Sequence, residues 1–122
     1  MMPSYLLYQI KLNTQQIQTQ VFRDIKFDTM MLRDGEAQKP VDAACALNLY
    51  KLVALIAAHD IEEAFNVGNG YPSSSRSRIE KFRHAYSMSV GDVLIDIEAE
   101  KAYACCSHGW QQINFTPTTY AA

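Results

Sequence analysis

The residues best suited to chemistry lie close together near the end of the chain, in the run Cys105-Cys106-Ser107-His108. Thiolates and imidazoles are good ligands for zinc. Adjacent residues of a strand point to opposite faces, however, so Cys105 and Cys106 are poorly placed to bind the same ion, and no CxxC pair or second histidine-rich segment completes a set of four ligands. We therefore expect no metal and no other cofactor, and we interpret the two thiols as small buried apolar side chains.

Nucleophilic catalysis by Cys106, with His108 or a more distant histidine as its base, would require a lowered thiol pKa and an oriented imidazole. The sequence indicates neither. The carboxylates are also better placed for turns and helix caps than for an acid and base pair. No GxxxxGK[ST] or GxGxxG motif is present, which disfavours ATP and dinucleotide chemistry. We predict no catalytic residue, and an enzyme with an unfamiliar site at Cys106 and His108 is kept as an alternative.

The segment from residue 71 to residue 86 is the most basic part of the chain, and Glu80 is its only acid. Guanidinium and ammonium groups can hold a phosphate or an acidic protein surface, and tyrosine rings can stack on a base. The candidate binding residues are Tyr71, Arg76, Arg78, Lys81, Arg83, His84 and Tyr86. The alternative is a solvated loop, because the serines between residues 73 and 77 are typical of an exposed, mobile connection, followed by a helical turn over 78–83.

The composition is that of an ordinary globular domain. A length of 122 residues suits one domain with its own core. Apolar residues make up 48% and charged residues 20%, which argues against a disordered or fibrous chain. The net charge of −2 gives no general attraction to phosphate backbones or anionic membranes, so nucleic-acid binding would depend on a local patch.

We expect the protein to be cytoplasmic, in a bacterial-type cell, and not bound to a membrane. The first residues lack the basic region and the cleavage site of a signal peptide. The longest strongly apolar run, 52–58, is far shorter than the roughly 20 residues that a membrane helix needs. Three cysteines make a poor disulfide framework and suit a reducing compartment.

The first half of the chain predicts a strand, a helix and a less regular stretch. Residues 5–12 alternate as in a pleated strand, and Asn13 or Thr14 can cap a helix over 14–24. The apolar stripe of this helix consists of Ile17, Val21, Phe22 and Ile25. A packed loop is expected over 26–39, with Pro40 opening a short helix that ends near residue 48. The apolar contacts of the loop are expected from Phe27, Met30, Met31 and Leu32.

Residues 50–57 form an apolar run that could be a buried strand or the end of a longer helix beginning at Pro40. The strand is favoured, because Asp60 and Glu63 have the spacing of a capping box, which would start a new helix at Ile61. The glycines of Gly68-Asn69-Gly70 would end that helix.

The clearest pattern lies between Tyr86 and Phe115, where we predict a meander of three strands over 93–97, 102–106 and 110–115. The residues that define its turns and its closure are Ser87, Ser89, Gly91, Asp92, Gly109 and Trp110. Trp110 is expected in the core, because a large ring after a tight turn commonly closes a small sheet. Pro117 is expected to end the last strand and to leave a frayed tail. The elements together predict an α+β fold, a single domain over 1–122 whose antiparallel sheet includes the meander and is packed by two to three helices.

The motif Ser87-Met88-Ser89-Val90-Gly91-Asp92-Val93-Leu94 is followed by Tyr103-Ala104-Cys105 and by Ser107-His108-Gly109-Trp110-Gln111-Gln112-Ile113. In this arrangement the last third of the chain resembles the YodL-like small domains found in proteins of plasmids, integrative conjugative elements and some phages. Upstream, 52–56 and 60–66 are similar to the strand and the helix that precede this pattern in the family.

This resemblance implies a setting and transfers no catalytic residues. Small accessory proteins of mobile genetic elements commonly act by binding other proteins, which is an association and not a mechanism. We therefore expect a non-enzymatic accessory protein that binds a host or element-encoded protein and inhibits a host defence system such as restriction or CRISPR. The alternatives are a nucleic-acid-binding module that uses 76–84 and the enzyme with a Cys106 and His108 site. The oligomeric state is left open.

Overall fold

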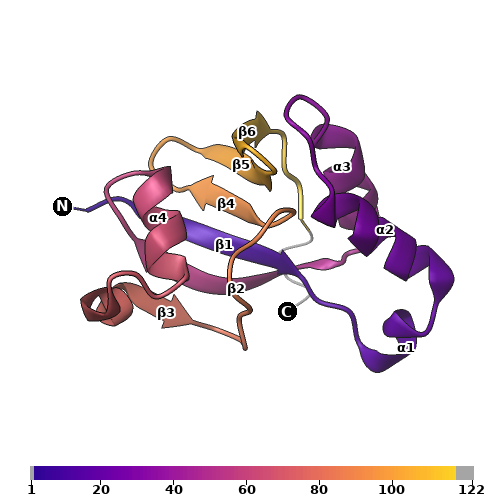
Figure 1. Ribbon diagram of the computed structural model, residues 1–122, viewed down its shortest axis with the longest axis horizontal. Coiled ribbons are helices and arrows are strands. Elements are labelled where there is room, and N and C mark those ends of the chain that lie inside the picture. The colour runs from indigo at the N-terminus through magenta and orange to yellow at the C-terminus, as the bar shows by residue number, and fades with distance from the viewer. Residues whose placement is uncertain (1, 118–122) are drawn as a thin grey trace.

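Residues 2–117, which the computed structural model describes, form a six-stranded antiparallel sheet in the order β3-β2-β1-β4-β5-β6, with helices packed on it (Figure 1). The strands are β1 (Ser4–Ile10), β2 (Tyr50–Ala57), β3 (Ile79–Lys81), β4 (Val93–Asp96), β5 (Lys101–Cys106) and β6 (Gly109–Ile113). The helices are α1 (Thr14–Ile17), α2 (Gln20–Met30), α3 (Gln38–Ala46), α4 (Ile61–Gly68) and the 3₁₀ helix η1 (Ser73–Arg78). The predicted α+β class is confirmed, with four α-helices in the described residues where two to three were expected.

The two faces of the sheet carry separate cores, because side chains alternate along each strand. One core, on the side of α4, consists of Tyr5, Leu7, Val53, Ala54, Ile56, Ala58, Ala64, Val67, Met88 and Leu94. The other, on the side of α3, consists of Tyr8, Ile10, Leu32, Ala37, Val41, Ala44, Leu49, Tyr50, Val93, Ala102, Ala104, Cys106 and Ile113. Figure 1 shows α4 near one end of the sheet and α2 and α3 near the other. No helix in the described part of the chain combines the length and the apolar character needed to cross a bilayer.

The middle of the chain folds as predicted. Residues 50–57 form β2, and α4 begins at Ile61. Oδ1 of Asp60 accepts a hydrogen bond from the Glu63 backbone N–H at 2.8 Å, which is one half of the expected capping box. The Glu63 carboxylate accepts its bond from the backbone N–H of His59 rather than from that of Asp60.

The C-terminal meander is confirmed, since β4, β5 and β6 are neighbours in the sheet and follow one another in the chain. Cys106 and Gly109 face each other across the two-residue turn of the last hairpin. The strands are slightly shorter than expected: β4 ends before Ile97, which is 43% exposed, and β6 ends at Ile113. The tail expected after Pro117 lies outside the described residues.

The single helix expected after the first strand is two helices, α1 and α2. They are separated by Gln18 and Thr19, and Thr19, whose backbone is extended (φ −102°, ψ 122°), is the N-cap of α2. Of the four residues predicted to form one apolar stripe, two are exposed, so the prediction is wrong for half of them. Ile17 and Val21 are 53% and 52% exposed, whereas Phe22 and Ile25 pack against the core on the side of α3.

The packed loop expected after residue 26 is also partly wrong, because α2 continues to Met30. Phe27, Met30 and Met31 were expected to provide apolar contacts, but they are 60%, 55% and 60% exposed. Leu32, by contrast, is 2% exposed and belongs to the core. Pro40 lies within the first turn of α3, where the N–H that proline lacks has no partner in the helix in any case.

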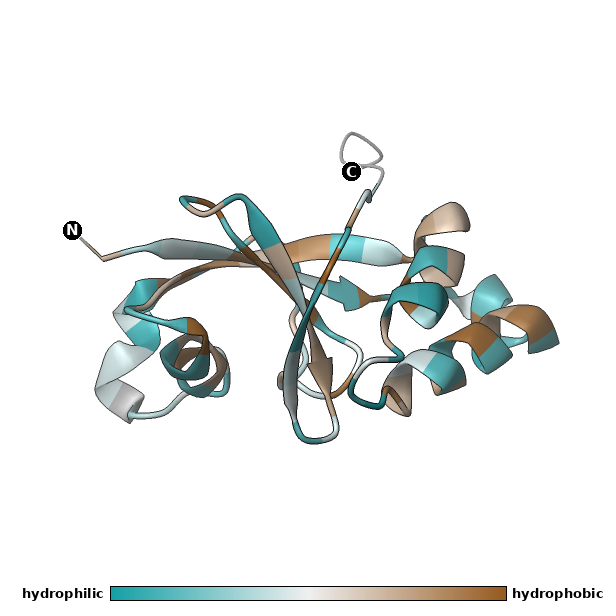
Figure 2. Cartoon of the chain, turned by 90° about the horizontal axis from the view of Figure 1, so that it is seen from above, coloured by the Kyte–Doolittle hydropathy of each residue, from teal (hydrophilic) through white to brown (hydrophobic). Residues whose placement is uncertain are grey.

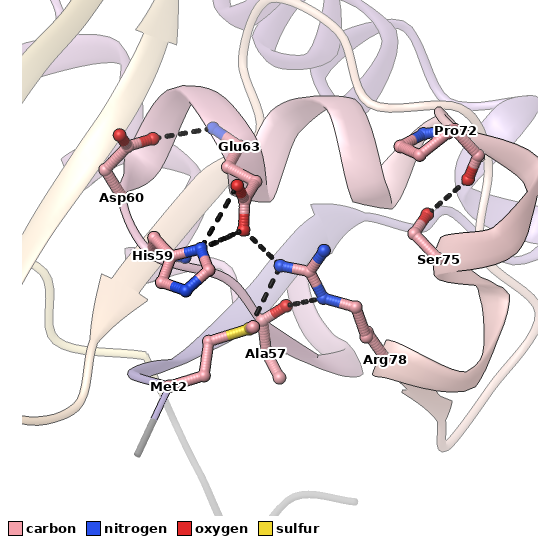
Figure 3. Close-up of polar contacts among 8 residues, drawn as sticks. All are labelled: Met2, Ala57, His59, Asp60, Glu63, Pro72, Ser75 and Arg78. Atoms are coloured by element: carbon pink, nitrogen blue, oxygen red, sulfur yellow. Dashed lines mark hydrogen bonds and ion pairs between the residues drawn. The ribbon is translucent and has the colours of Figure 1, made fainter.

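The exposed loop expected over 71–83 contains ordered structure instead, namely η1 and β3. Ser75 is 2% exposed, and its hydroxyl donates to the carbonyl of Pro72 at 2.6 Å, which closes a turn of η1 (Figure 3). The helical turn expected over 78–83 is wrong, because this stretch includes an edge strand. β3 pairs with β2 and supplies hydrogen-bond partners to an edge that would otherwise be open.

Candidate functional site

A cavity of about 620 Å³ lies between the end of α4, the η1 and β3 elements and the segment that follows β3. We call it the Arg76 pocket. It brings together Arg76, Lys81 and Tyr86 from the predicted set of binding residues, and its other lining residues are Gly68, Asn69, Gly70, Ile79, Ala85 and Ser87. No carboxylate of the described residues lines it, because alternation along β3 turns Glu80 to the face opposite Lys81.

Arg78 is part of the fold rather than of the Arg76 pocket (Figure 3). Its guanidinium donates to the Glu63 carboxylate and to the backbone carbonyl of Ala57, the latter at 3.0 Å. The backbone N–H of His59, followed by the Arg78 guanidinium, lowers the pKa of Glu63 to about 2. These contacts tie the end of η1 to the end of β2 and to the start of α4.

We expect Arg78→Ala to destabilise the protein and Arg76→Ala to leave its stability nearly unchanged. The bond from Arg78 to the Ala57 carbonyl is worth about 1 kcal/mol, or roughly 4 °C in melting temperature. The Arg76 side chain is exposed and makes no hydrogen bond with a described residue. Both variants remove one positive charge, so thermal unfolding compares them directly. Equal melting temperatures would show that the Arg78 contacts do not stabilise the fold.

Three further residues of the predicted binding set also lie outside the Arg76 pocket. Nε of Arg83 donates to the Leu52 carbonyl at 3.1 Å and so anchors the chain after β3. The His84 ring packs edge-on against the Tyr86 ring, with 5.2 Å between the ring centroids. Tyr71 is 69% exposed and follows the end of α4. The predicted basic cluster is therefore divided, and part of it serves the fold.

Tyr86 is held by residues from the N-terminal half of the chain. The side-chain amide of Gln9 donates to the Tyr86 carbonyl and accepts from the Tyr86 N–H, each at 3.0 Å. The ring is 55% exposed, with Nζ of Lys11 at 4.8 Å and Nζ of Lys26 at 6.0 Å from its centroid. These three partners were not predicted. The one available signal was Gln9, a polar residue within an apolar strand.

A second cavity, of about 190 Å³, shares Tyr86 and Ser87 with the first, and we call it the Asp92 pocket. Asp92 is 7% exposed, and its Oδ2 accepts hydrogen bonds from the Gln9 side chain and from the Ser89 N–H, both at 3.0 Å. Burial raises the pKa of Asp92 to about 6, although the two hydrogen bonds and the charge of Lys26 act in the opposite direction. Asp92 thus closes its turn, as predicted, and is in addition a buried carboxyl that titrates near neutral pH.

We expect Asp92 to make stability fall as the pH rises from about 4 to about 7. Folding raises the pKa of Asp92 above its ordinary value of 3.8, so its contribution is complete below that value and is lost as the pH passes through about 6. A shift of this size corresponds to about 2 to 3 kcal/mol. Urea unfolding at several pH values, for the native chain and for Asp92→Asn, isolates the effect. A difference between the two proteins that does not change with pH would contradict it.

The cysteines are buried, as interpreted from the sequence. Cys105 and Cys106 are 7% and 3% exposed. Burial raises the pKa of both thiols, that of Cys105 to about 11. Sγ of Cys106 lies 3.7 Å from the Ala104 carbonyl, whereas Nδ1 of His108 lies 3.2 Å from the Ser107 hydroxyl. A raised thiol pKa leaves little thiolate at neutral pH, so this geometry does not favour a thiol nucleophile.

The other residues of the meander pattern serve packing and backbone geometry. The Trp110 ring is half-buried and packs edge-on against Phe65 of α4, with 6.1 Å between the ring centroids. The carbonyl of Gly91 accepts a hydrogen bond from the Tyr50 hydroxyl at 2.6 Å. Ser87 is exposed and lines both cavities. The bond from Tyr50 holds the turn that leads into β4.

A second candidate surface is the outer face of α2, which we define as Phe27, Met30 and Met31. Phe27 and Met30 are three positions apart, so their side chains lie on the same side of the helix, and Met31 follows directly as its C-cap residue. The opposite side of α2 packs on the core through Phe22 and Ile25. Figure 2 shows that hydrophobic and hydrophilic segments alternate along the helices at the end of the molecule remote from the N-terminus. α2 is therefore apolar on two sides, and its outer face is solvent-exposed in the described chain.

The outer face of α2 is adjacent to Tyr86. Met30 and Lys26 line the Asp92 pocket together with Tyr86, which joins the apolar surface to the lysines around the ring. In comparisons with protein-family models, curated proteins and solved structures, nothing matches the chain. Its function is therefore inferred from its own geometry and sequence pattern.

Proposed function

We propose that this chain is a non-enzymatic accessory protein of a mobile genetic element that acts by binding another protein, and that its target belongs to a host defence system such as restriction or CRISPR. The observation that carries the proposal is the outer face of α2. Two large apolar side chains and that of the C-cap residue Met31 lie in solvent there, at a helix whose other side already packs on the sheet. A helix that needed only to cover the sheet would be expected to be polar on its outer side.

The outer face of α2 has the chemistry of an interface core. Single exposed apolar residues are ordinary, but a contiguous group of large ones marks a surface that binds. Burial of each such side chain is worth roughly 1.5 to 3 kcal/mol. Aromatic residues and methionine are enriched in interface cores, and the flexible thioether of methionine adapts to the shape of a partner. This composition supports protein binding more directly than it supports catalysis.

The surroundings of the outer face indicate the character of the partner. Lys11 and Lys26 lie beside Tyr86, and Lys26 shares the Asp92 pocket with Met30. A partner with an apolar centre and an acidic rim would match this surface in both respects. Tyr86 is exposed on an anchored backbone, which is a good position for a residue that contributes strongly to binding.

The mobile-element part of the proposal is supported by the resemblance of 87–113 to the YodL-like domains. That support is an association at the level of sequence pattern, and no residue role is transferred with it. A target in a host defence system is inferred from this setting, because an incoming element must survive restriction and CRISPR before its other proteins are useful.

Affinity copurification tests the proposal. The tagged protein is produced in a bacterial host that has restriction and CRISPR systems, and the bound proteins are identified by mass spectrometry. We expect a component of one of these systems to be recovered, and we expect the transfer of an unmodified plasmid into the same host to rise when the protein is present. Recovery of no partner together with unchanged plasmid transfer would contradict the proposal.

A further inference from the structure

The Arg76 pocket holds two positive charges that the fold does not use. Arg76 and Lys81 both line it, both are exposed, and neither side chain forms a hydrogen bond or an ion pair with a described residue. Their neighbours in the sequence behave differently, since Arg78 is paired with Glu63 and Arg83 is bonded to a backbone carbonyl. Two unused cations in one cavity without a carboxylate favour an anionic ligand.

The end of α4 also borders the Arg76 pocket, and the C-terminus of a helix carries a partial negative charge. Its last carbonyls are already engaged. The carbonyl of Asn66 accepts from the Tyr71 N–H at 2.8 Å, and that of Val67 accepts from the Gly70 N–H at 2.9 Å. A partial charge of about half a unit, bonded in this way, is smaller than the two full charges opposite it. The pocket as a whole therefore favours an anion.

The pocket offers more than charge. Tyr86 contributes an exposed ring, and its backbone N–H and carbonyl are both hydrogen-bonded to the Gln9 side chain. Ile79 and Ala85 add apolar surface. The volume of about 620 Å³ falls within the range of roughly 300 to 1,000 Å³ that is usual for small-molecule sites. Inorganic phosphate would fill little of this space. A ligand that fits the whole pocket has a planar or apolar part next to its anionic group.

We propose that the Arg76 pocket binds a nucleotide unit, with the base against the Tyr86 ring and the phosphate between Arg76 and Lys81. A free mononucleotide and a nucleotide within a single strand of nucleic acid share this chemistry. An acidic peptide could engage the two cations, but it would leave the apolar wall of Ile79 and Ala85 without a partner, so the nucleotide is favoured. The pocket adjoins the surface that includes the outer face of α2 and shares Tyr86 with it, but Arg76 and Lys81 lie only in the pocket, and the inference does not depend on the proposed protein partner.

Titration of the full chain, followed by NMR signals of the Tyr86 ring, tests this inference. The probes are adenosine monophosphate, a short oligothymidylate, inorganic phosphate and polyglutamate, all at physiological ionic strength. We expect the nucleotide or the oligonucleotide to shift the Tyr86 ring signals together with the methyl signals of Ile79 and Ala85, which line only this one of the two pockets, and we expect polyglutamate to leave the Ile79 and Ala85 signals unchanged. Equal affinity for the two nucleotide probes identifies a free nucleotide as the ligand, and binding of the oligonucleotide alone identifies single-stranded nucleic acid.

Two variants and a control locate the site. Tyr86→Leu should weaken binding of the preferred nucleotide probe about tenfold through loss of stacking, and Arg76→Gln with Lys81→Gln should weaken it by about as much through loss of phosphate contacts. Arg33→Gln with Lys39→Gln removes the same charge from exposed positions outside the pocket and should have little effect. Circular dichroism verifies that each variant is folded. Equal losses in the two double variants, binding of polyglutamate at Ile79 and Ala85, or no binding of either nucleotide probe would overturn the inference.

Discussion

Replacement of Gly91 by alanine will destabilise the fold by about 2 to 5 kcal/mol, a large effect for one methyl group. Gly91 has a φ of +97°, and a Cβ at this position would lie 2.6 Å from the carbonyl oxygen of Thr29 and 3.0 Å from its carbonyl carbon. The left-handed backbone costs a non-glycine residue about 1 to 2 kcal/mol, and overpacking adds about 1 to 3 kcal/mol. The contacted atoms belong to the backbone of α2, so the helix itself would have to move. Because α2 also carries Lys26 and Met30, this contact sets the position of the outer face relative to Tyr86.

Gly35→Ala is the control for this prediction. Gly35 also has a positive φ, +81°, but no atom lies within 4 Å of an added Cβ. Its replacement should therefore cost only the backbone contribution, about 1 to 2 kcal/mol. Denaturant unfolding of the two variants gives both free energies of unfolding. An equal loss in the two would show that α2 is not packed tightly against the turn at Gly91.

Substitution of serine for both Phe27 and Met30 should weaken binding to the copurified partner by at least about tenfold, while the melting temperature changes little. The loss of two apolar anchors from the centre of an interface exceeds the 1.4 kcal/mol that corresponds to a tenfold change in affinity. The same side chains are 60% and 55% exposed in the free protein, so they contribute little to its fold. Affinity is measured by interferometry with the immobilised variant and the identified partner.

The control for this variant removes apolar surface elsewhere. Leu47 and Ile97 are 41% and 43% exposed and lie outside the outer face of α2. Leu47→Ser with Ile97→Ser should leave the affinity within about threefold of the native value, as is typical of positions outside an interface. Similar losses of affinity in both double variants would mean that the partner was retained by nonspecific hydrophobic contacts rather than by the outer face of α2.

The C-terminal meander could be predicted from the sequence because each of its features is local. The strands alternate with a period of two, the turn residues stand between them, and each strand pairs with the next one along the chain. The same is true of the N-terminus of α4, where the Asp60 side chain caps a backbone N–H three residues away. Signals of this kind need no knowledge of the tertiary fold.

The α2 region could not be predicted in the same way. The break at Thr19 lies in a glutamine-rich stretch without glycine or proline, so nothing local marks the end of one helix and the start of the next. The apolar residues of α2 then occupy two sides, and only packing on the sheet decides which side is buried. If the helix is extended to Met30, the spacing of Phe27, Met30 and Met31 indicates its second side.

Only part of the candidate site could be predicted from the sequence. Arg76, Lys81 and Tyr86 belong to the basic segment that the sequence indicated, but the same segment also supplied Arg78 and Arg83, whose side chains are bonded within the fold. Charge alone does not distinguish a cation with an internal partner from a free one. The remaining contacts of Tyr86 come from distant parts of the chain, and Gln9 is 77 residues away. Pairs this far apart become visible only in the folded structure.

The claim that the outer face of α2 contacts a host protein is tested most directly by site-specific photocrosslinking in cells. A photoreactive amino acid replaces Phe27 in one variant and Ile97 in another, and both are produced in a bacterial host that carries restriction and CRISPR systems. The variant at Phe27 should form a discrete adduct with a component of one of these systems, and the variant at Ile97 should form none. No adduct at position 27, or the same adducts from both positions, would contradict the claim.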